Sequence, residues 1–348
     1  MKIVLTGGGT AGHVFPGINI GNYMRETYGA KLYFVGNKHH IEEKIANQQN
    51  IPFYGISSQG LEGKTILHKY VGFGAKNVKG VFEAVSILRK INPDYVLGTG
   101  GFVSAPTLAA ARILGIPFAI HEQNTVMGKV NKLFVNQAKT CFYSFPVQET
   151  RNVVYSGNPV RFKEKLTKNG EHLVFLGGSG GSIQLNQTAI EFAKKHPEIP
   201  CIVVTGERNY QRAIVNGVPD NVEVHGYVED MQSLYEKAKL FVARSGAGSV
   251  FELANLGIPS ILVPLPTSAD DHQKKNAEYF SLKQAAVMVE QNNQFENELG
   301  KAILDYWNND QKRSEMKDEL EKLARRNSDQ IVAERIVKDL NKQQIYLQ

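Results

Sequence analysis

GGGTAGHVFP, residues 7–16, is the stretch that decides the fold of this chain. It follows the apolar run Ile3-Val4-Leu5 and precedes a helical pattern that we expect over residues 16–28. A strand, a glycine loop and a helix start, in that order, present backbone N–H groups and a positive helix end to an anion. The glycines at 7, 9 and 12 also match the dinucleotide pattern G-x-G-x-x-G.

The next strand argues against a dinucleotide. Residues 31–36 end in Asn37-Lys38, so no carboxylate stands where the ribose of a dinucleotide needs one. A histidine, His13, lies at the mouth of the loop instead. Taken alone, the stretch leaves open an anion site and a plain turn that packs a helix on a sheet.

Length and composition indicate two globular domains. A chain of 348 residues is too long for one ordinary hydrophobic core. No apolar run approaches the roughly 20 residues of a membrane span, and we expect no signal peptide, since the N-terminus enters a strand directly. Cys141 and Cys201 lie in apolar runs without metal-ligand spacing. Both features are typical of a cytoplasmic protein with buried, reduced thiols.

The positive charge is uneven. Residues 1–160 carry 16 Lys and Arg against 8 Asp and Glu, whereas the remainder carries 24 against 26. A basic half suits nucleic acid, an anionic bilayer or a phosphorylated substrate. It is also compatible with lysines that are merely solvated.

Short apolar runs alternate with amphipathic ones in the first half. Alternation of this kind predicts an α/β fold with a parallel, doubly wound sheet, in which ligands bind at the carboxyl ends of the strands. The loops at those ends are 7–16, 98–101 (GTGG) and 121–124 (HEQN). We expect strands at 2–6, 31–36, 52–56, 94–98, 117–121 and 140–143, and helices at 16–28, 39–49, 104–114 and 128–138.

Residues 62–82 have a different character. Four lysines alternate with large apolar residues there: Lys64, Lys69, Lys76 and Lys79 with Leu67, Tyr70, Val71, Phe73 and Phe82. This mixture suits a membrane surface, and it suits equally an ordinary helix whose apolar stripe faces the core. The glycines in the segment argue against one long regular helix.

The pattern restarts after a Gly-Asn-Pro turn and a lysine-rich stretch at 155–170, where we place the domain boundary. Residues 172–182, HLVFLGGSGGS, form a second strand and glycine loop, and further strands are expected at 200–205, 222–225, 240–243, 259–263 and 286–289. The chain then turns helical from Phe295. Two glycine loops that open two successive α/β halves predict tandem Rossmann-like domains.

The richest segment is 240–257, LFVARSGAGSVFELANLG. Small residues at 245–249 let a phosphate approach the backbone and supply hydroxyl and N–H donors. Glu252, one turn into the following helix, either accepts the hydroxyls of a ribose or simply complements the helix N-terminus.

Residues 264–276 bring Gln273 and Asn276 to a helix mouth, where amides suit sugar hydroxyls. Asp270 and Asp271 are adjacent and point apart, so we expect no metal site. The chain has no complete Walker loop, which argues against the common kinase interpretation, and we expect no hydrolase.

These residues together resemble the MurG family of bacterial glycosyltransferases. The matching stretches, in order, are GGGTAGHVFP (7–16), GTGGFVSAP (98–106), GIPFAIHEQN (115–124), GNPVR (157–161), LGGSGGS (176–182), VEDM (228–231), ARSGAGSVFELANLGIPSILVP (243–264) and DHQKKNA (271–277). Four positions, Ala11, Ala105, Gly180 and Ser182, depart from the usual motifs. The resemblance implies a GT-B architecture: domains 1–160 and 161–328, with a C-terminal helix of about 329–348 returning to the first domain.

The resemblance also assigns residues. It implies that UDP is held by Arg161, Ser179, Val228, Ala247, Gly248, Ser249, Val250, Phe251 and Glu252, with Glu252 on the ribose, Val228 on the uracil, and Ser179 with the 247–249 backbone on the diphosphate. Gln273 is implied to bind N-acetylglucosamine, and Thr10, Ala11, Gly12 and Asn124 to close over sugar and acceptor. His13 resembles the proposed general base of the family.

The implied activity is inverting, metal-independent transfer of N-acetylglucosamine from UDP-GlcNAc to lipid I, forming lipid II of peptidoglycan, without a cofactor. The ordinary pKa of histidine, near 6.5, suits a base in such a reaction. The polyprenyl acceptor implies that the basic first domain sits on the anionic cytoplasmic face of the cell membrane, and we expect no nucleic acid partner. A transferase with another lipid or glycoside acceptor, and a UDP-GlcNAc epimerase on the same frame, remain alternatives.

Overall fold

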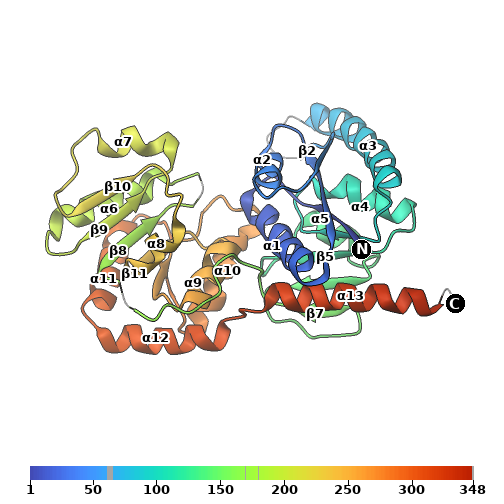
Figure 1. Ribbon diagram of the computed structural model, residues 1–348. Helices are drawn as coiled ribbons and strands as arrows, with labels where there is room; N and C mark the ends of the chain where they lie inside the picture. Colours follow the sequence, from blue (N-terminus) through green and yellow to red (C-terminus); the bar gives the residue numbers. More distant parts are fainter. Residues whose placement is uncertain (61–65, 169, 179, 347–348) are drawn as a thin grey trace. The chain divides into compact units, whose positions relative to one another are not determined.

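A computed structural model describes residues 1–60, 66–168, 170–178 and 180–346, and it divides the chain into two compact units. Unit 1 comprises Met1–Arg161 and Asn327–Gln348, and unit 2 comprises Phe162–Arg326. The last helix therefore belongs to unit 1. Arg161 also falls in unit 1, whereas the expected domain ranges put it at the start of the second domain. Figure 1 shows the order of the elements within each unit.

Unit 1 is built on a seven-stranded parallel sheet with the strand order β3-β2-β1-β4-β5-β6-β7. Its strands are β1 (Lys2–Thr6), β2 (Lys31–Asn37), β3 (Phe53–Ile56), β4 (Tyr95–Gly98), β5 (Phe118–Glu122), β6 (Thr140–Tyr143) and β7 (Val153–Tyr155). Its helices are α1 (Ala11–Tyr28), α2 (Ile41–Gln48), α3 (Ile66–Ile91), α4 (Ser104–Ile113), α5 (Lys129–Phe134) and α13 (Ser328–Tyr346). The sequence pattern missed β7, a three-residue edge strand.

Two hydrophobic cores lie on the two faces of this sheet. One core joins α1, α2 and α13 to the sheet, through residues such as Ile18, Ile45 and Ile336. The other joins α3, α4 and α5 to the opposite face, through residues such as Leu88, Leu108 and Phe134. Alternate side chains of β1 enter opposite cores, as the twofold period of a strand requires.

Unit 2 repeats the plan with a six-stranded parallel sheet, ordered β10-β9-β8-β11-β12-β13. Its strands are β8 (His172–Leu176), β9 (Cys201–Val204), β10 (Val222–His225), β11 (Ala238–Ala243), β12 (Ser260–Leu262) and β13 (Val287–Met288). Its helices are α6 (Ile183–Lys195), η1 (Glu207–Asn209), α7 (Tyr210–Ile214), α8 (Met231–Glu236), α9 (Ala247–Leu256), η2 (Ala269–Asp271), α10 (His272–Leu282), α11 (Phe295–Trp307) and α12 (Asp310–Leu323). The α/β prediction of two doubly wound parallel sheets is confirmed.

Segment 62–82 corrects one expectation. Although it contains glycines, α3 runs without interruption for 26 residues from Ile66 to Ile91. At Gly80 a Cβ would meet the carbonyl oxygen of Ser57 at 1.9 Å, so this glycine lets the helix approach the segment after β3. The glycine therefore serves close packing and does not break the helix. Lys64 lies outside the described residues.

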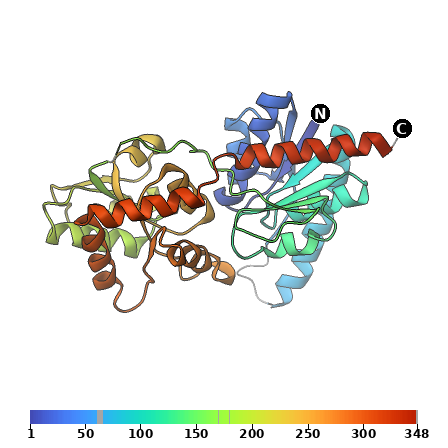
Figure 2. The same cartoon turned by 90° about the horizontal axis from the view of Figure 1, so that it is seen from below.

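Helix α13 is tied to the sheet by a buried carboxylate. Asp339, 3% exposed, accepts hydrogen bonds through Oδ2 from the hydroxyls of Tyr95 (3.1 Å) and Thr140 (2.7 Å). Its Oδ1 accepts from Nε of Arg335 at 3.1 Å. Figures 1 and 2 show this helix, in red, lying along unit 1 beside α1, and the packing of Val332 and Ile336 agrees with that view. The tail is thus an integral part of the unit.

We predict that Asp339→Ala destabilises unit 1 by about 3 kcal/mol, because two buried hydroxyls and a half-buried guanidinium lose their common partner. Hydrogen–deuterium exchange should show amides of β1 and β4 exchanging roughly a hundredfold faster, while amides of unit 2 keep their protection. Glu334→Ala, an exposed carboxylate on the same helix, is the matched control and should change little. Unchanged exchange in Asp339→Ala would show that the helix does not depend on this contact.

Candidate active site

The glycine loop of unit 1 lies at the switch point of its sheet. β1 and β4 are neighbours, and the chain leaves them toward opposite edges. Loops at such a point leave a crevice in which α/β proteins bind ligands. The backbone N–H of Gly8 donates to the carbonyl oxygen of Gly100 (3.3 Å). A Cβ at Gly101 would lie 2.1 Å from the carbonyl oxygen of Gly8, so the approach of these loops requires glycine.

Helix α1 begins at Ala11 and not near residue 16, which corrects the expected start. The His13 N–H donates to the Thr10 carbonyl at 3.1 Å and closes the first turn, so the helix starts where the glycine loop ends. Thr10 is the N-cap in an extended conformation, and its side chain makes no capping hydrogen bond. Thr10 and Gly12 are exposed, and Ala11 is half-buried. The N-terminus of α1 therefore presents backbone donors that its own cap residue does not occupy.

His13 is held through both its backbone and its ring. The Thr99 hydroxyl donates to the His13 carbonyl at 2.6 Å, and Nδ1 of the His13 ring lies 3.0 Å from Oε1 of Gln123. Behind Gln123 lies His121, whose Nδ1 is 3.1 Å from Nε2 of Gln123 and whose Nε2 is 3.2 Å from the Gly157 carbonyl. Complete burial lowers the pKa of His121 to about 4. The half-buried His13 ring thus terminates a buried polar chain.

Glu122 organises the loop that follows β5. It is 2% exposed and accepts hydrogen bonds from the backbone N–H groups of Asn124 (3.0 Å) and Gly128 (2.8 Å). It also accepts from Nδ2 of Asn131 at 2.8 Å. A carboxylate with three such donors fixes the loop, and with it the position of the half-buried Asn124.

Unit 2 has its own switch point between β8 and β11, where the helices α6 and α9 begin. The N-terminus of α6 is closed, because the Ser182 hydroxyl caps it by accepting from the Leu185 N–H. Arg244, 7% exposed, donates to that hydroxyl at 2.7 Å and to the carbonyl oxygens of Val263 and Pro264. Burial lowers the pKa of Arg244 to about 10. This arginine ties together the loops after β8, β11 and β12.

The N-terminus of α9 is open by contrast. Its N-cap is Gly246, which has no side chain to cap the helix, and a Cβ at Gly246 or Gly248 would meet no described atom within 4 Å. Ser249 and Gly248 are half-buried. Bare N–H groups at a helix start are an anion site with little steric hindrance. The side chains of Ala247, Val250 and Phe251 are buried in the core, so only their backbone can reach a ligand.

Glu252 lies in the second turn of α9 and is oriented by a tyrosine. The hydroxyl of Tyr235 donates to Oε2 of Glu252 at 2.6 Å. The Tyr235 ring is fully buried, and its burial together with the nearby Glu252 raises its pKa well above the ordinary value. A hydroxyl that stays protonated is a permanent donor, so it restrains the carboxylate of Glu252.

The other predicted residues of unit 2 surround these loops. Gln273 accepts from the Leu265 N–H through Oε1 (3.0 Å), and its carbonyl accepts from the Ser245 hydroxyl (2.8 Å). This arrangement leaves the Nε2 group of Gln273 as a donor for a ligand. Val228 is half-buried in the loop after β10, and Arg161 of unit 1 is exposed. Ser179 lies outside the described residues.

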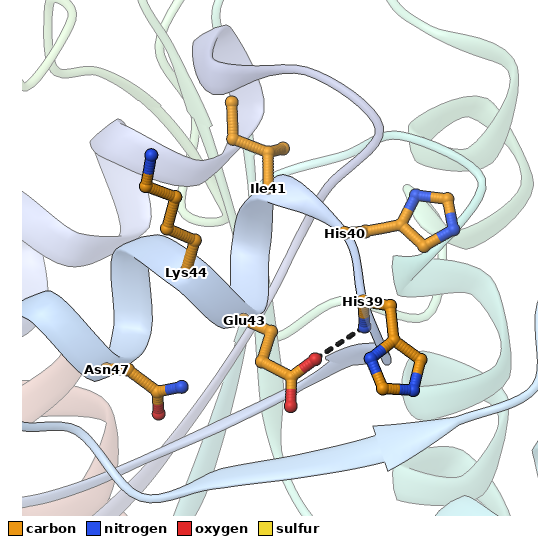
Figure 3. A pocket seen from close by; sticks show the side chains of 6 residues that line it. All are labelled: His39, His40, Ile41, Glu43, Lys44 and Asn47. Carbon is orange, nitrogen blue, oxygen red and sulfur yellow. Dashed lines mark hydrogen bonds between the residues drawn. The ribbon is translucent and has the colours of Figure 1, made fainter.

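A shallow hollow lies at the start of α2, in the segment that follows β2. It is lined by His39, His40, Ile41, Glu43, Lys44 and Asn47. Figure 3 shows the Glu43 carboxylate accepting a hydrogen bond from the backbone N–H of His39, in the turn before the helix. All its lining residues come from one helix and the turn before it. No polar groups from separate elements converge there, so we do not assign the active site to it.

Sequence reasoning missed the residues that hold the site residues in place. Gln123, Arg244 and Tyr235 are buried and touch predicted residues or their loops. Gln123 and Arg244 lie inside the motifs that resemble the family. Each directly follows a buried strand, and a polar residue in that position could have indicated a role at the site. The sequence around Tyr235 gives no indication of its hydrogen bond to Glu252, because Glu252 lies 17 residues further along the chain.

Comparisons with known proteins agree with this architecture. The model of the glycosyltransferase family 28 N-terminal domain matches residues 3–143, and that of the family 28 C-terminal domain matches residues 172–332. The chain therefore contains both domains of a family 28 glycosyltransferase.

Individual relatives indicate which member of the family 28 glycosyltransferases this chain resembles. UDP-N-acetylglucosamine–N-acetylmuramyl-(pentapeptide) pyrophosphoryl-undecaprenol N-acetylglucosamine transferase of Methylococcus capsulatus is 34% identical, covering 87% of this chain and 90% of that protein. The Bacteroides fragilis protein of the same name is 31% identical, covering 97% and 95%. The crystal structure of Acinetobacter baumannii MurG matches with a TM-score of 0.79 and 28% identity, over 97% of this chain and 99% of that one. The chain belongs to the MurG family.

A further solved structure shares the fold alone. A putative UDP-N-acetylglucosamine 2-epimerase from Listeria monocytogenes has a TM-score of 0.70 at 12% identity, covering 98% of this chain and 97% of that one. The two-domain fold alone therefore does not distinguish a transferase from an epimerase. Membership of the MurG family does distinguish them.

We predict that Tyr235→Phe weakens binding of UDP about tenfold, because Glu252, the ribose ligand that the family resemblance implies, loses its hydrogen-bond donor. Titration calorimetry with UDP measures the effect. Tyr306→Phe removes a hydroxyl on α11, which carries none of the predicted site residues, and should bind as the wild type does. Equal affinities of all three proteins would show that Glu252 needs no such orientation.

Proposed function

We propose that this protein transfers N-acetylglucosamine from UDP-GlcNAc to lipid I, undecaprenyl-pyrophosphoryl-MurNAc-pentapeptide, with inversion at the anomeric carbon. The observation that carries the proposal is the name shared by relatives that match it over most of both chains. The site geometry supports it, because one unit has an open helix N-terminus beside a carboxylate and the other has a positioned histidine.

In unit 2 the roles follow the chemistry of the donor sugar nucleotide. The backbone N–H groups of 247–249, with Ser179, take the diphosphate, while Glu252 accepts the ribose hydroxyls through the carboxylate that Tyr235 orients. Val228 borders the uracil. Gln273 donates through Nε2 to hydroxyls of the sugar, and Arg161, a residue of unit 1, contributes positive charge to the diphosphate.

In unit 1 the roles concern the acceptor. Thr10, Ala11, Gly12 and Asn124 lie on loops at the strand ends, where they border the sugar and the acceptor. The acceptor hydroxyl attacks the anomeric carbon from the face opposite UDP, and its proton passes to His13. A carbon–oxygen bond forms, the bond to the UDP oxygen breaks, and the configuration inverts.

The leaving group determines the need for a metal. UDP departs with negative charge on its β-phosphate, and the helix N-terminus of α9 stabilises that charge with fixed N–H donors. We therefore propose that the reaction proceeds without a divalent cation.

The direct test incubates labelled UDP-GlcNAc with lipid I and follows labelled lipid II. We expect His13→Ala to lower kcat by roughly 10²- to 10⁴-fold with little change in KM, since a general base acts in the transition state. We expect Glu252→Ala to raise KM for UDP-GlcNAc roughly 10- to 100-fold, since it removes charge-assisted hydrogen bonds present throughout the reaction.

Two control incubations separate the alternatives. EDTA should leave the rate unchanged, and a loss restored by Mg²⁺ would contradict the metal-independent mechanism. Free UDP and a free sugar product formed without any acceptor would identify an epimerase instead. Transfer to another lipid or glycoside, with none to lipid I, would keep the transferase and replace the acceptor.

We further propose that unit 1 binds the anionic cytoplasmic face of the cell membrane, where a polyprenyl-linked acceptor resides. Helices α3, α4 and α5 cover one face of its sheet and expose large apolar side chains: Val78 (56%), Phe82 (71%), Ile113 (64%) and Leu133 (64%). Exposed cations lie on the same helices: Lys76, Lys79, Arg112, Lys129 and Lys132. Exposed apolar groups and cations on the same helices suit an interfacial surface.

The residues that the structure describes include no helix long and apolar enough to cross a membrane.

Vesicle co-sedimentation tests the membrane proposal. Replacing Lys76 and Lys79 by glutamine should weaken binding to anionic phosphatidylglycerol vesicles roughly 30-fold, at about 1 kcal/mol for each lysine. Phe82→Ser should weaken binding as well, whereas Leu282→Ser, which alters a side chain 83% exposed in unit 2, should not. Equal binding of every variant, or equal binding to neutral vesicles, would refute this surface.

A further inference from the structure

Gln123 connects His13 and His121 of unit 1 and is itself almost inaccessible. It directly follows β5, is 1% exposed, and lies with Nε2 toward His121 and Oε1 toward His13. The oxygen of a side-chain amide only accepts hydrogen bonds, and its nitrogen only donates them. When both ends are buried against partners, the orientation of the amide determines which partner must accept and which must donate.

The backbone fixes which way this amide points. Nε2 of Gln123 is 2.9 Å from the carbonyl oxygen of His121, in addition to 3.1 Å from its Nδ1. A carbonyl oxygen can only accept, so the amide nitrogen must lie on that side. The reversed amide would bring two acceptor oxygens together in a buried place. Oε1 of Gln123 therefore faces His13.

The ring of His121 agrees with this direction. Its Nε2 faces the carbonyl oxygen of Gly157 at 3.2 Å, so Nε2 carries the hydrogen. Its burial lowers its pKa to about 4, so the ring is neutral at neutral pH and Nδ1 keeps its lone pair. That lone pair accepts the second N–H of Gln123. Each donor in this row of hydrogen bonds, from Gly157 through His121 to Gln123, therefore meets an acceptor.

The direction determines the tautomer of His13. Its Nδ1 lies 3.0 Å from Oε1 of Gln123, which only accepts, so Nδ1 carries the hydrogen of the neutral ring. The lone pair is then on Nε2, for which no hydrogen-bond partner is found in the described part of the chain. When Nε2 takes a proton, the Nδ1 hydrogen bond persists and becomes charge-assisted.

We propose that Gln123 is a positioning residue that holds His13 in the Nδ1–H tautomer, so that Nε2 is the atom that accepts the proton of the acceptor hydroxyl. This inference rests on the proposed role of His13 as the base. Gln123 touches no substrate in this account. It acts only by selecting the tautomer and the orientation of the ring, as a second partner commonly does for a functional histidine.

The kinetic test replaces Gln123 by methionine, an apolar side chain of similar length. Gln123→Met should lower kcat about tenfold or more, while KM for UDP-GlcNAc stays within twofold. In the His13→Ala background the same change should cause no further loss, because the two residues act as one unit. Thr107→Val, another buried polar-to-apolar change in unit 1, is the control and should leave kcat unchanged.

The spectroscopic test needs no variant of Gln123. Long-range ¹H–¹⁵N correlation spectra of the protein labelled in its histidines distinguish the two tautomers, and His13→Ala identifies the His13 signals by their loss. We expect hydrogen on Nδ1 of His13 and on Nε2 of His121 at neutral pH. Gln123→Met should shift His13 toward a mixture of tautomers.

The outcomes are distinguishable. Hydrogen on Nε2 of His13 in the wild type, or an undiminished effect of Gln123→Met in the His13→Ala background, overturns this inference and leaves the proposed transfer intact. Full turnover in His13→Ala instead refutes the role of the base. The tautomer measured in the spectrum still decides whether Gln123 directs the ring.

Discussion

The structure depends on the close approach of backbones at the carboxyl ends of neighbouring strands in its two parallel sheets. In unit 1 a Cβ at Gly101 would collide with the Gly8 carbonyl, and in unit 2 a Cβ at Gly181 would lie 1.9 Å from the Thr205 carbonyl. Both glycines also have positive φ. Because no side chain intervenes, loops from neighbouring strands meet, and the helix starts that follow them become available to a ligand.

The two units use this shared geometry differently. Unit 2 leaves the start of α9 uncapped, which suits a diphosphate, and orients one carboxylate with Tyr235, which suits ribose hydroxyls. Unit 1 buries a directional polar chain behind His13, which suits proton transfer. A buried chain of neutral groups is stable only when every donor finds an acceptor, so its direction is set by the carbonyl groups at its ends.

Much of the fold could be predicted from the sequence, and the errors in the predicted helices have physical causes. Apolar runs and glycine loops predicted both sheets, because parallel strands buried on two faces leave a strong local signal. The expected start of α1 was wrong because the helix already begins at Ala11, inside the glycine-rich stretch, and continues through Pro16. The uninterrupted α3 was misjudged because the reason for Gly80 is a contact with Ser57, distant in the chain.

The sequence by itself determined the fold class, the two glycine loops and the residue types of the site, since these rest on local patterns. Only the tertiary structure decided which residues orient them. Tyr235 reaches Glu252, Arg244 joins three loops, and Gln123 joins His121 to His13, which lies 110 residues before Gln123. Hydrogen-bond direction depends on which groups meet in a buried place, and folding, not sequence spacing, brings those groups together.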